Sequence, residues 1–440
     1  AAIPVFNLCL LGLSSLAVHG ILKHQYKLPD APRRVLFFAY LMANTVLVQY
    51  WFGEREQMIV LGLFPMALLQ VGVTRRLPPP PEFKMPVLLF GSIAALIKPL
   101  YLLVPGAIFV HRAIKQKRLS VAGDLDFAVM TMMFAIYVAL LVYVFGNYVD
   151  VILPDAMKLY VMSTHYGTAV SISFAAALAL GFALAAAAER AQVDKDAGAI
   201  TATLIALALL CLTPCILQDK GYLYHFIPAM VFAVCGLSLL AMPWFGDRTG
   251  TRTCVILSFF CYLISAAPML VVPHHDTMDA YPLTAEASRG APECSYFLFD
   301  NVYNVQTVAN YAGCEHASRF SDLWFLQTLL GEQYAIEHNL PHKLNRDEIA
   351  AYSAKFAALV TEDLKRWKPD TIIVARIEMV SGQKFNFEDW FSEHDHEFAL
   401  LWQGYKYEKE VHAFYPHFLF GDNDKPGSMD ITYEIYRKQL

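Results

Sequence analysis

Polar side chains gather between two long apolar runs of the sequence, in the segment 218–228 (QDKGYLYHFIP). Lys220 supplies a positive charge, and the rings of Tyr224 and His225 supply groups that form hydrogen bonds. Charged and polar groups at membrane depth are costly unless they meet a polar ligand. We therefore expect this segment to bind a polar substrate or head group, with an interfacial aromatic belt as the alternative explanation of its tyrosines.

Three charged residues, Glu54, Arg55 and Glu56, fall within the short segment 52–57 (FGEREQ) between two other apolar runs. The planar guanidinium group of arginine matches the geometry of a phosphate, and a carboxylate beside it can orient the guanidinium or accept a proton. This segment therefore predicts a second wall of a phosphate site. A solvated surface turn is the alternative.

Lys98 lies inside the apolar segment 86–112 and is followed by Pro99. A lysine within the membrane indicates a functional site, because an unpaired charge there is unfavourable by several kcal/mol. The alternative is a lysine that extends its ammonium group to the membrane surface. Pro99 argues against that alternative, because a proline frees a backbone carbonyl and fixes a kink where polar groups collect.

Arg55, Lys98 and Lys220 are thus three cations expected in the outer half of a helix bundle. Such a set suits the phosphate of a lipid carrier whose tail stays in the bilayer. The chain has a net charge of −5 and no basic face outside its short loops, so nucleic acid is excluded as a partner.

The elements that must position these cations are apolar stretches about 20 residues long, the length that crosses a bilayer. Hydrophobic residues make up 56% of the 440 residues and charged residues only 17%, which is too apolar for an ordinary soluble enzyme. The sequence predicts about eight spans, at 2–22, 35–51, 58–74, 127–147, 168–188, 199–217, 226–245 and 253–272.

Lysine and arginine are distributed unevenly among the loops. Five loops carry fifteen of them, and the three loops 52–57, 146–167 and 218–225 carry one each. The positive-inside rule makes the first set cytoplasmic and the second set extracytoplasmic. Because the segment 86–112 has basic flanks at both ends and two halves too short to span, we expect a re-entrant pair of short helices. The amphipathic stretch 154–162 is expected in the outer membrane interface.

After residue 272 the pattern changes to short strands and amphipathic helices, which predicts a soluble α/β domain over 273–440 behind a transmembrane domain over 1–272. The fold class is therefore a mostly α, polytopic membrane helix bundle with a C-terminal soluble α/β domain. No dinucleotide-binding, P-loop or nucleophile-elbow motif occurs in the domain. The expected elements are a strand at 296–300, helices at 303–312 and 345–367, a strand at 371–377, and a hairpin of 398–402 with 405–414.

The eight cysteines divide into six in apolar stretches and two in the C-terminal domain. The six are expected to be reduced and to fill the core. Cys294 and Cys314 are the only pair in the outward-facing domain, so the sequence predicts a disulfide between them. Neither the cysteine nor the histidine spacing suggests a zinc site, and a divalent cation is left undecided.

These motifs together resemble the bacterial GT-C superfamily of multi-spanning glycosyltransferases. The resemblance rests on the ordered set FGxRE (Phe52–Glu56), KP (Lys98–Pro99) and KGxxYHxxP (Lys220–Pro228). The run 318–324 (SRFSDLW), with Arg319, is similar to a Ser-Arg-Phe-Pro-x-Leu-Trp pattern of that superfamily. Members also have an outward C-terminal domain.

The resemblance implies an inverting transfer of a sugar from a polyprenyl-phosphate donor to a glycan or protein acceptor at the periplasmic face of the bacterial inner membrane. Arg55, Lys98 and Lys220 would hold the lipid phosphate, Glu54, Tyr224 and His225 would complete the substrate site, and Arg319 would lie near the acceptor. The superfamily's main carboxylate precedes its second helix, so we expect it upstream of residue 1, and Glu56 is the candidate within this chain.

Two other functions stay open from the sequence. One is a ligase or polymerase of lipid-linked glycans, which would use an oligosaccharide on a pyrophosphate. The other is a non-catalytic scaffold subunit of a membrane complex. No tightly bound cofactor is predicted, and membrane lipids are expected partners in every case.

Overall fold

The computed structural model describes residues 2–48, 52–146, 149, 153–160, 167–190, 195–218, 223–241, 281–289, 294–300, 308–309, 312–320, 323–377, 385–415 and 429–439. The chain divides into two compact units. Unit 1 contains Ala1–Ile152 and Thr164–Val271, and unit 2 contains Leu153–Ser163 and Val272–Leu440.

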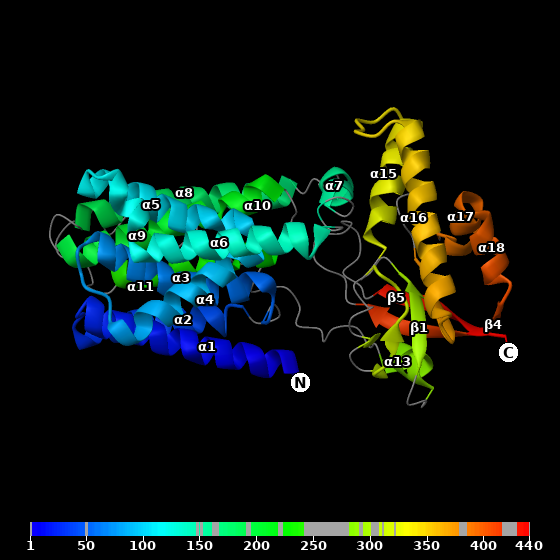
Figure 1. Ribbon diagram of the computed structural model, residues 1–440, viewed down its shortest axis with the longest axis horizontal. Helices are drawn as coiled ribbons and strands as arrows, with labels where there is room; N and C mark the ends of the chain where they lie inside the picture. The colour runs from blue at the N-terminus through cyan, green and yellow to red at the C-terminus, as the bar shows by residue number, and fades with distance from the viewer. Residues whose placement is uncertain are drawn as a thin grey trace. The chain divides into compact units, whose positions relative to one another are not determined.

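Unit 1 is a bundle of helices that lie alongside one another (Figure 1). Its helices are α1 (Ala2–Gly20), α2 (Asp30–Asn44), α3 (Arg55–Thr74), α4 (Pro81–Ile97), α5 (Leu103–Gln116), α6 (Leu125–Tyr143), α8 (Gly167–Arg190), α9 (Lys195–Cys211), α10 (Thr213–Gln218) and α11 (Ile227–Ala241). Short helical turns join them: η1 (Ile21–Gln25), η3 (Pro99–Leu102), η4 (Leu119–Gly123) and η7 (Leu223–Phe226).

Four helical stretches of the described residues are long and apolar enough to cross a membrane: Val5–Gln25, Arg55–Thr74, Leu125–Tyr143 and Gly198–Leu217. Two shorter apolar helices cover Ala175–Ala188 and Tyr224–Leu240. These helices indicate a membrane-associated protein. The structure supports four of the eight expected spans by length and composition, and the expected span at 253–272 lies outside the described residues.

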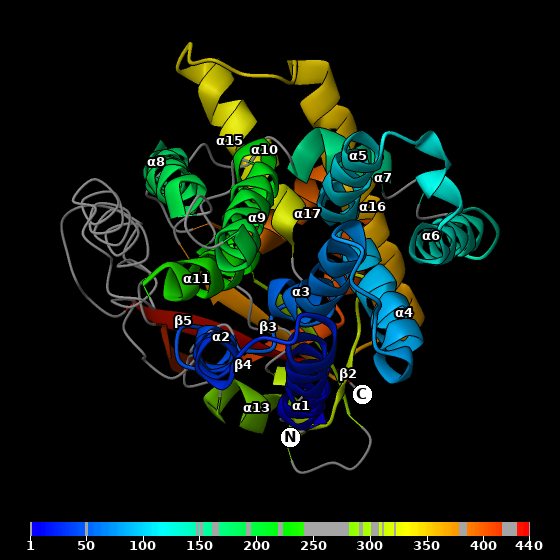
Figure 2. The same cartoon turned by 90° about the vertical axis from the view of Figure 1, so that its left-hand side faces the viewer.

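Helix α3 is the central element of the bundle when the helices are viewed end-on (Figure 2). Its residues are apolar on nearly every face, and 89% of the residues in its most apolar 18-residue stretch are buried. A helix of this kind is stable only when neighbours surround it. The ring of Phe64 in α3 stacks on Tyr40 of α2 at 4.8 Å and contacts Phe232 of α11 at 4.9 Å, which ties three helices together.

Small residues allow α3 and α4 to pack at very short range. A Cβ atom placed on Gly62 would lie 2.5 Å from the Cβ of Ala94, and one on Gly91 would lie 2.5 Å from the Cβ of Met66. Glycine at both positions therefore sets the helix separation, as is common between helices in membranes. The two contacts run in opposite directions along the chain, so the helices are antiparallel and the start of α3 lies beside the end of α4.

The expected break at Lys98–Pro99 is present. Lys98 ends α4 in an extended conformation (φ −140°, ψ 96°), and Pro99 begins η3. Helix α4 starts at Pro81 rather than near residue 86, because a proline is favourable in the first turn of a helix, where its missing N–H would be unpaired anyway. Helix α4 therefore has 17 residues, more than the 12 to 14 predicted for each half of this segment.

Unit 2 is the predicted α/β layer. Its helices are α7 (Leu153–Asp155), η6 (Ala156–Tyr160), α13 (Tyr281–Ser288), α15 (Trp324–Glu337), α16 (Arg346–Trp367), α17 (Phe387–His394) and α18 (His396–Trp402). The strands are β1 (Ser295–Phe299), β2 (Glu315–His316), β3 (Thr371–Arg376), β4 (Tyr405–Tyr415) and β5 (Met429–Lys438), in the order β2-β1-β3-β5-β4. Strand β1 is parallel to β2 and β3, and β5 is antiparallel to β3 and β4.

The predicted hairpin of 398–402 with 405–414 is wrong. Residues 398–402 are the end of α18, which begins at Asp395, where the side chain accepts a hydrogen bond from the backbone N–H of Glu397. Strand β4 pairs instead with β5. The long helix beginning at Asn345 is confirmed, and Asn345 and Glu348 form a reciprocal capping box. The helix expected at 303–312 lies largely outside the described residues.

Residues 153–163 belong to unit 2, which corrects their assignment to the transmembrane domain. Leu159 is fully buried in the core of unit 2, and its carbonyl accepts a hydrogen bond from Thr328 of α15. Lys158 pairs with Glu348 of α16 at 2.6 Å. One face of this stretch therefore packs on α15 and α16, and its place in a membrane interface stays a prediction.

The predicted disulfide between Cys294 and Cys314 is present, with Cα atoms 4.8 Å apart. It joins the residues that precede β1 and β2, two parallel neighbours in the sheet. The bridge constrains a loop of about 20 residues, a size for which such constraints stabilise a domain by about 3 kcal/mol.

Because the space around Gly62 is filled and the space around Gly106 is open, replacement by alanine is expected to change stability in different ways at the two positions. Gly62→Ala is expected to separate α3 from α4 and destabilise unit 1 by about 1–3 kcal/mol, because the new methyl group has no room. Gly106→Ala on α5, where nothing lies within 4 Å, is expected to be neutral or stabilising. Thermal unfolding in detergent measures both, and equal shifts would contradict the packing argument.

The burial of His316 predicts that unit 2 becomes less stable at acid pH. Burial beside the ring of Tyr296 lowers the pKa of His316 from 6.5 to about 4. The folded protein therefore resists a proton that the unfolded chain accepts, so stability is complete above pH 6.5 and decreases as the pH falls toward 4. His316→Phe should reduce this loss. Amide hydrogen exchange of β1 at pH 7 and pH 5, corrected for intrinsic rates, measures it, and an identical loss in both proteins would refute the prediction.

Candidate functional site

The carboxylate of Glu56, in the first turn of α3, is fully buried and binds two basic side chains through one oxygen. Its Oε1 lies 2.8 Å from the Nζ of Lys98 and 3.6 Å from the Nε2 of His225. Glu56 is 0% exposed and His225 is 3% exposed. We call these three residues the Glu56 cluster.

Three separate elements bring the cluster together. The antiparallel packing of α3 on α4 places Glu56 opposite the residue that ends α4. The extended backbone at Lys98 turns the chain out of α4, so that its side chain meets the first turn of α3. His225 comes from η7, the turn that begins α11.

The second carboxylate oxygen of Glu56, Oε2, is buried and has no hydrogen-bond partner among the described residues. An ionised carboxylate can accept several hydrogen bonds, and a buried acceptor without a donor is unfavourable by about 1–3 kcal/mol or more. Other buried polar atoms of the described residues also lack a partner, but Oε2 is the only carboxylate oxygen among them, and an ionised acceptor is the most costly kind to leave unpaired. Oε2 is therefore the atom of this cluster that is suited to accept a proton or a hydroxyl group.

The turn before α3 is held firmly by Gln57. Its side-chain amide donates to the carbonyl of Asn44 at 2.8 Å, and its Oε1 accepts from the N–H of Gly53 at 2.6 Å. Gly53 has φ 102°, a conformation that glycine adopts without strain. These bonds fix the backbone at the start of α3, where Glu54 and Arg55 lie.

Arg55 and Glu54 differ in their surroundings although they are neighbours. Arg55 is exposed at the first position of α3, and no ion pair of Arg55 is found among the described residues. Burial raises the pKa of Glu54, and the nearby Glu56 carboxylate raises it further. The start of α3 therefore presents an exposed guanidinium beside a helix N-terminus, an arrangement that attracts anions.

The structure brings together three of the predicted site residues, Glu56, Lys98 and His225, and places Glu54 and Arg55 directly beside them in the chain. The ring of Tyr224 contacts that of His225 edge-on, with centroids 4.6 Å apart. Lys220 lies outside the described residues.

Arg319 is in unit 2, where acidic residues of α16 bind it. Its Nε lies 2.6 Å from Asp363, and its terminal nitrogen lies 2.6 Å from Glu362. The backbone N–H of Arg319 also donates to Asp363 at 2.9 Å. The guanidinium therefore holds the segment before α15 against α16, a structural role that the sequence motif does not reveal.

Two residues of the site escaped sequence reasoning. Tyr101, in η3, donates a hydrogen bond from its hydroxyl to the carbonyl of His225 at 3.4 Å, and the thiol of Cys215, in α10, donates to the same carbonyl at 3.1 Å. Tyr101 follows Lys98 by three residues, so its position after the break was the available signal. Nothing in the sequence distinguishes Cys215 from the other buried cysteines.

A second buried ion pair lies toward the other end of α3. Arg112 of α5 is fully buried and forms two hydrogen bonds with Asp126, of 2.9 and 2.6 Å. It also bonds to Thr74, Asp124 and the carbonyl of Gln70. Its guanidinium thus joins α3, α5 and the start of α6, with all its bonds inside the protein.

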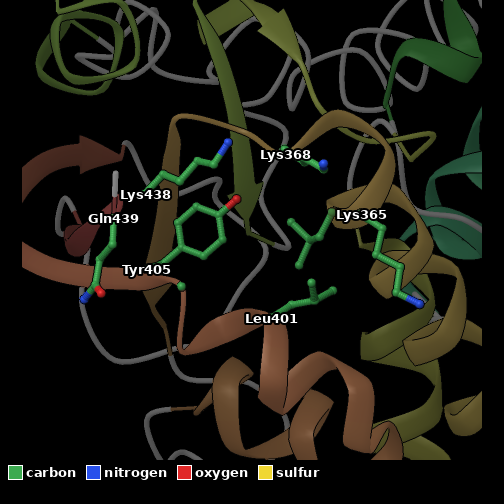
Figure 3. A pocket seen from close by; sticks show the side chains of 8 residues that line it. Lys365, Lys368, Leu401, Tyr405, Lys438 and Gln439 are labelled. Atoms are coloured by element: carbon green, nitrogen blue, oxygen red, sulfur yellow. The ribbon is translucent and has the colours of Figure 1, made fainter.

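Unit 2 has a pocket of about 270 Å³ beside the end of α16 (Figure 3). Leu364, Leu401 and the ring of Tyr405 form its apolar lining, and Lys365, Lys368, Gly404, Lys438 and Gln439 complete it. Lys365 and Lys368 lie where a cation stabilises the C-terminus of α16, Lys365 pairs with Glu397, and Lys438 ends strand β5. This arrangement accounts for their positions without a ligand.

Among the described residues, no group of three or more histidine, cysteine, aspartate or glutamate side chains is arranged to hold a metal ion. The comparisons of this chain with protein-family models, with curated proteins and with solved structures found no match. The Glu56 cluster is therefore interpreted from its own chemistry.

The buried Arg112–Asp126 pair predicts that loss of a buried aspartate destabilises unit 1 much more than loss of an exposed one. Asp126→Ala is expected to destabilise unit 1 by about 3–5 kcal/mol, because it leaves the buried guanidinium without its main counter-charge. Asp30→Ala, which removes the exposed partner of Arg33, is the matched control and is expected to cost less than about 1 kcal/mol. Thermal unfolding in detergent compares the two, and shifts of similar size would contradict this account.

Proposed function

We propose that the protein is an integral membrane glycosyltransferase that moves a sugar from a polyprenyl-phosphate donor to an acceptor at the extracytoplasmic face of a bacterial inner membrane. The observation that carries the proposal is the Glu56 carboxylate, which binds Lys98 through one buried oxygen and has a second buried oxygen without a partner among the described residues. A base and a cation side by side in an apolar bundle suit transfer from a phosphate leaving group.

The proposed topology has eight spans, a re-entrant pair around Lys98 and an extracytoplasmic unit 2. The distribution of lysine and arginine among the loops supports it. The disulfide between Cys294 and Cys314 adds independent support, because disulfides persist in oxidising compartments and are rare in the cytosol. This topology puts the start of α3 and η7 at the outer side of the bundle.

In this mechanism the lipid phosphate binds between Arg55 and Lys98. The exposed guanidinium of Arg55 and the N-terminus of α3 supply positive charge at the membrane surface. The ammonium group of Lys98 has three N–H donors, and its hydrogen bond to Glu56 uses one of them. The remaining donors stabilise the phosphate as its negative charge increases during the reaction, and Lys220 is proposed to join them.

Glu56 is the proposed general base. The acceptor hydroxyl donates a hydrogen bond to Oε2 of Glu56 and attacks the anomeric carbon of the sugar. The bond from that carbon to the phosphate oxygen breaks, the electron pair leaves with the polyprenyl phosphate, and the hydroxyl proton passes to Glu56. A direct displacement of this kind inverts the anomeric configuration.

The first test uses the full chain in nanodiscs, with undecaprenyl-phosphate-linked pentoses and hexoses as donors and cell-envelope glycan fragments as acceptors. Glu56→Gln is expected to lower transfer by about 10²–10⁴-fold while donor binding is retained, because the amide cannot take the proton. Lys98→Gln is expected to lose both donor binding and transfer. Mass spectrometry of released undecaprenyl phosphate measures transfer, and native mass spectrometry measures binding.

Lys115→Gln, at an exposed lysine in the last turn of α5, is the matched control and should keep wild-type binding and transfer. Normal turnover in the Lys98→Gln protein would refute the proposed site. A scaffold subunit would be favoured if the folded wild-type protein turned over no donor and if the Lys98→Gln substitution left the fold of the protein unchanged. Turnover restricted to oligosaccharides on undecaprenyl pyrophosphate would indicate a ligase or polymerase.

A further inference from the structure

We infer that Tyr101 is a positioning residue of the Glu56 cluster, and that it acts with Cys215 through the backbone of His225. Tyr101 donates its hydroxyl hydrogen to the carbonyl of His225 at 3.4 Å, and the thiol of Cys215 donates to the same oxygen at 3.1 Å. The catalytic consequence of this inference rests on the proposed function, whereas the arrangement itself can be tested without it.

The bond from Tyr101 connects the two segments that carry the basic members of the cluster. Tyr101 lies in η3, directly after the break that places Lys98, and His225 lies in η7. Each segment is a single 3₁₀ turn that leads directly into a longer helix, η3 into α5 and η7 into α11. The hydroxyl of Tyr101 therefore links the segment that carries the Lys98 ammonium to the segment that carries the His225 imidazole.

The carbonyl of His225 lies at the junction of two helical geometries. It belongs to the 3₁₀ turn just before α11, and the residue three positions on, Pro228, has no N–H to complete a 3₁₀ bond to it. The side chains of Tyr101 and Cys215 donate to this carbonyl from two different elements, η3 and α10.

Both donors are buried, so water does not substitute for them readily. Tyr101 is 1% exposed and Cys215 is 5% exposed. A hydrogen bond in such a place holds geometry more strictly than one at the surface, because breaking it leaves a buried polar atom unpaired. A rotation of η7 that broke both bonds would also move the imidazole away from Oε1 of Glu56, which it approaches to 3.6 Å.

The consequence for the reaction is the direction of the Glu56 carboxylate. With Lys98 and His225 both at Oε1, the plane of the carboxylate is fixed and Oε2 stays available for the acceptor hydroxyl. If η7 shifts, His225 no longer helps to hold Oε1, whereas Lys98 still binds the donor phosphate. Loss of the Tyr101 bond should therefore lower kcat and leave the KM for the donor unchanged.

The experiment compares Tyr101→Phe, Cys215→Ala and the double variant in the full chain. The first readout is carbethoxylation of the His225 imidazole by diethylpyrocarbonate, detected by mass spectrometry, which requires no activity. We expect His225 to react about threefold faster in each single variant and about tenfold faster in the double variant, in line with the loss of one or two hydrogen bonds. The exposed His24 reports the intrinsic rate in every sample.

Matched controls separate positioning from general loosening. Tyr26→Phe removes an equivalent bond, from a tyrosine hydroxyl to the carbonyl of Leu68 at 2.7 Å, and should leave the reactivity of His225 unchanged. Cys235→Ala removes another buried thiol and should do the same. Cys215→Ser keeps a donor and should restore the protection that Cys215→Ala loses.

The inference would be overturned if His225 reacted at the wild-type rate in the double variant. It would also be overturned if Tyr26→Phe increased the labelling of His225 as much as Tyr101→Phe does. The second readout is the transfer reaction, in which the double variant is expected to lose about tenfold in kcat without a change in KM. Increased labelling of His225 in a protein that transfers no sugar would uphold the positioning role and reject the proposed function. The two failures are thus distinguishable.

Discussion

The ion pair between Glu56 and Lys98 is the interaction on which the arrangement of unit 1 depends. Two charges removed from water must pair closely, because each alone would cost several kcal/mol in an apolar interior. The pair is 2.8 Å long and forms only because α3 and α4 are antiparallel and because the backbone at Lys98 is extended rather than helical. The proline at residue 99, the glycine contacts between the helices and the turn that Gln57 holds before α3 all serve this one geometry.

A second buried ion pair restrains the opposite part of α3, so the central helix is held by charge near both of its ends. Arg112 and Asp126 form a complete network, in which the guanidinium bonds to Gln70, Thr74, Asp124 and Asp126. The Glu56 cluster is chemically different because one carboxylate oxygen has no partner among the described residues. This contrast separates a network that only stabilises the bundle from one that retains capacity for a ligand. Burial alone does not distinguish them, since Arg112 and Glu56 are both fully buried.

The sequence predicted the parts of the fold that depend on local pattern. Long apolar runs, the break at Lys98, the cap at Asn345 and the Cys294–Cys314 pair each follow from residue type and spacing. Lys98 was expected in one site with Arg55 and Lys220 from the topology, and Glu56 and His225 were added to that site by the family resemblance. The hairpin prediction failed because it depends on contacts distant in sequence: residues 398–402 form a helix capped by Asp395, and β4 pairs with β5. Residues 158 and 159 likewise contact α16 and α15, far along the chain. Tyr101 and Cys215 escaped for the same reason, since their shared acceptor is a backbone carbonyl that no side-chain pattern marks.

The same reasoning explains why Lys98 and Arg319, which both occur in suggestive motifs, end in different roles. Lys98 meets a single carboxylate and keeps donors for a further anion, whereas Arg319 meets Asp363 and Glu362 and also fixes its own backbone to Asp363. Two carboxylates around one guanidinium leave a net negative site, which repels a phosphate. A cation in a motif is therefore a ligand-binding candidate only when its counter-charge is incomplete. On that criterion the start of α3 and the break after α4 are the candidates for the proposed phosphate site, because Arg55 is exposed and Lys98 has one carboxylate partner there.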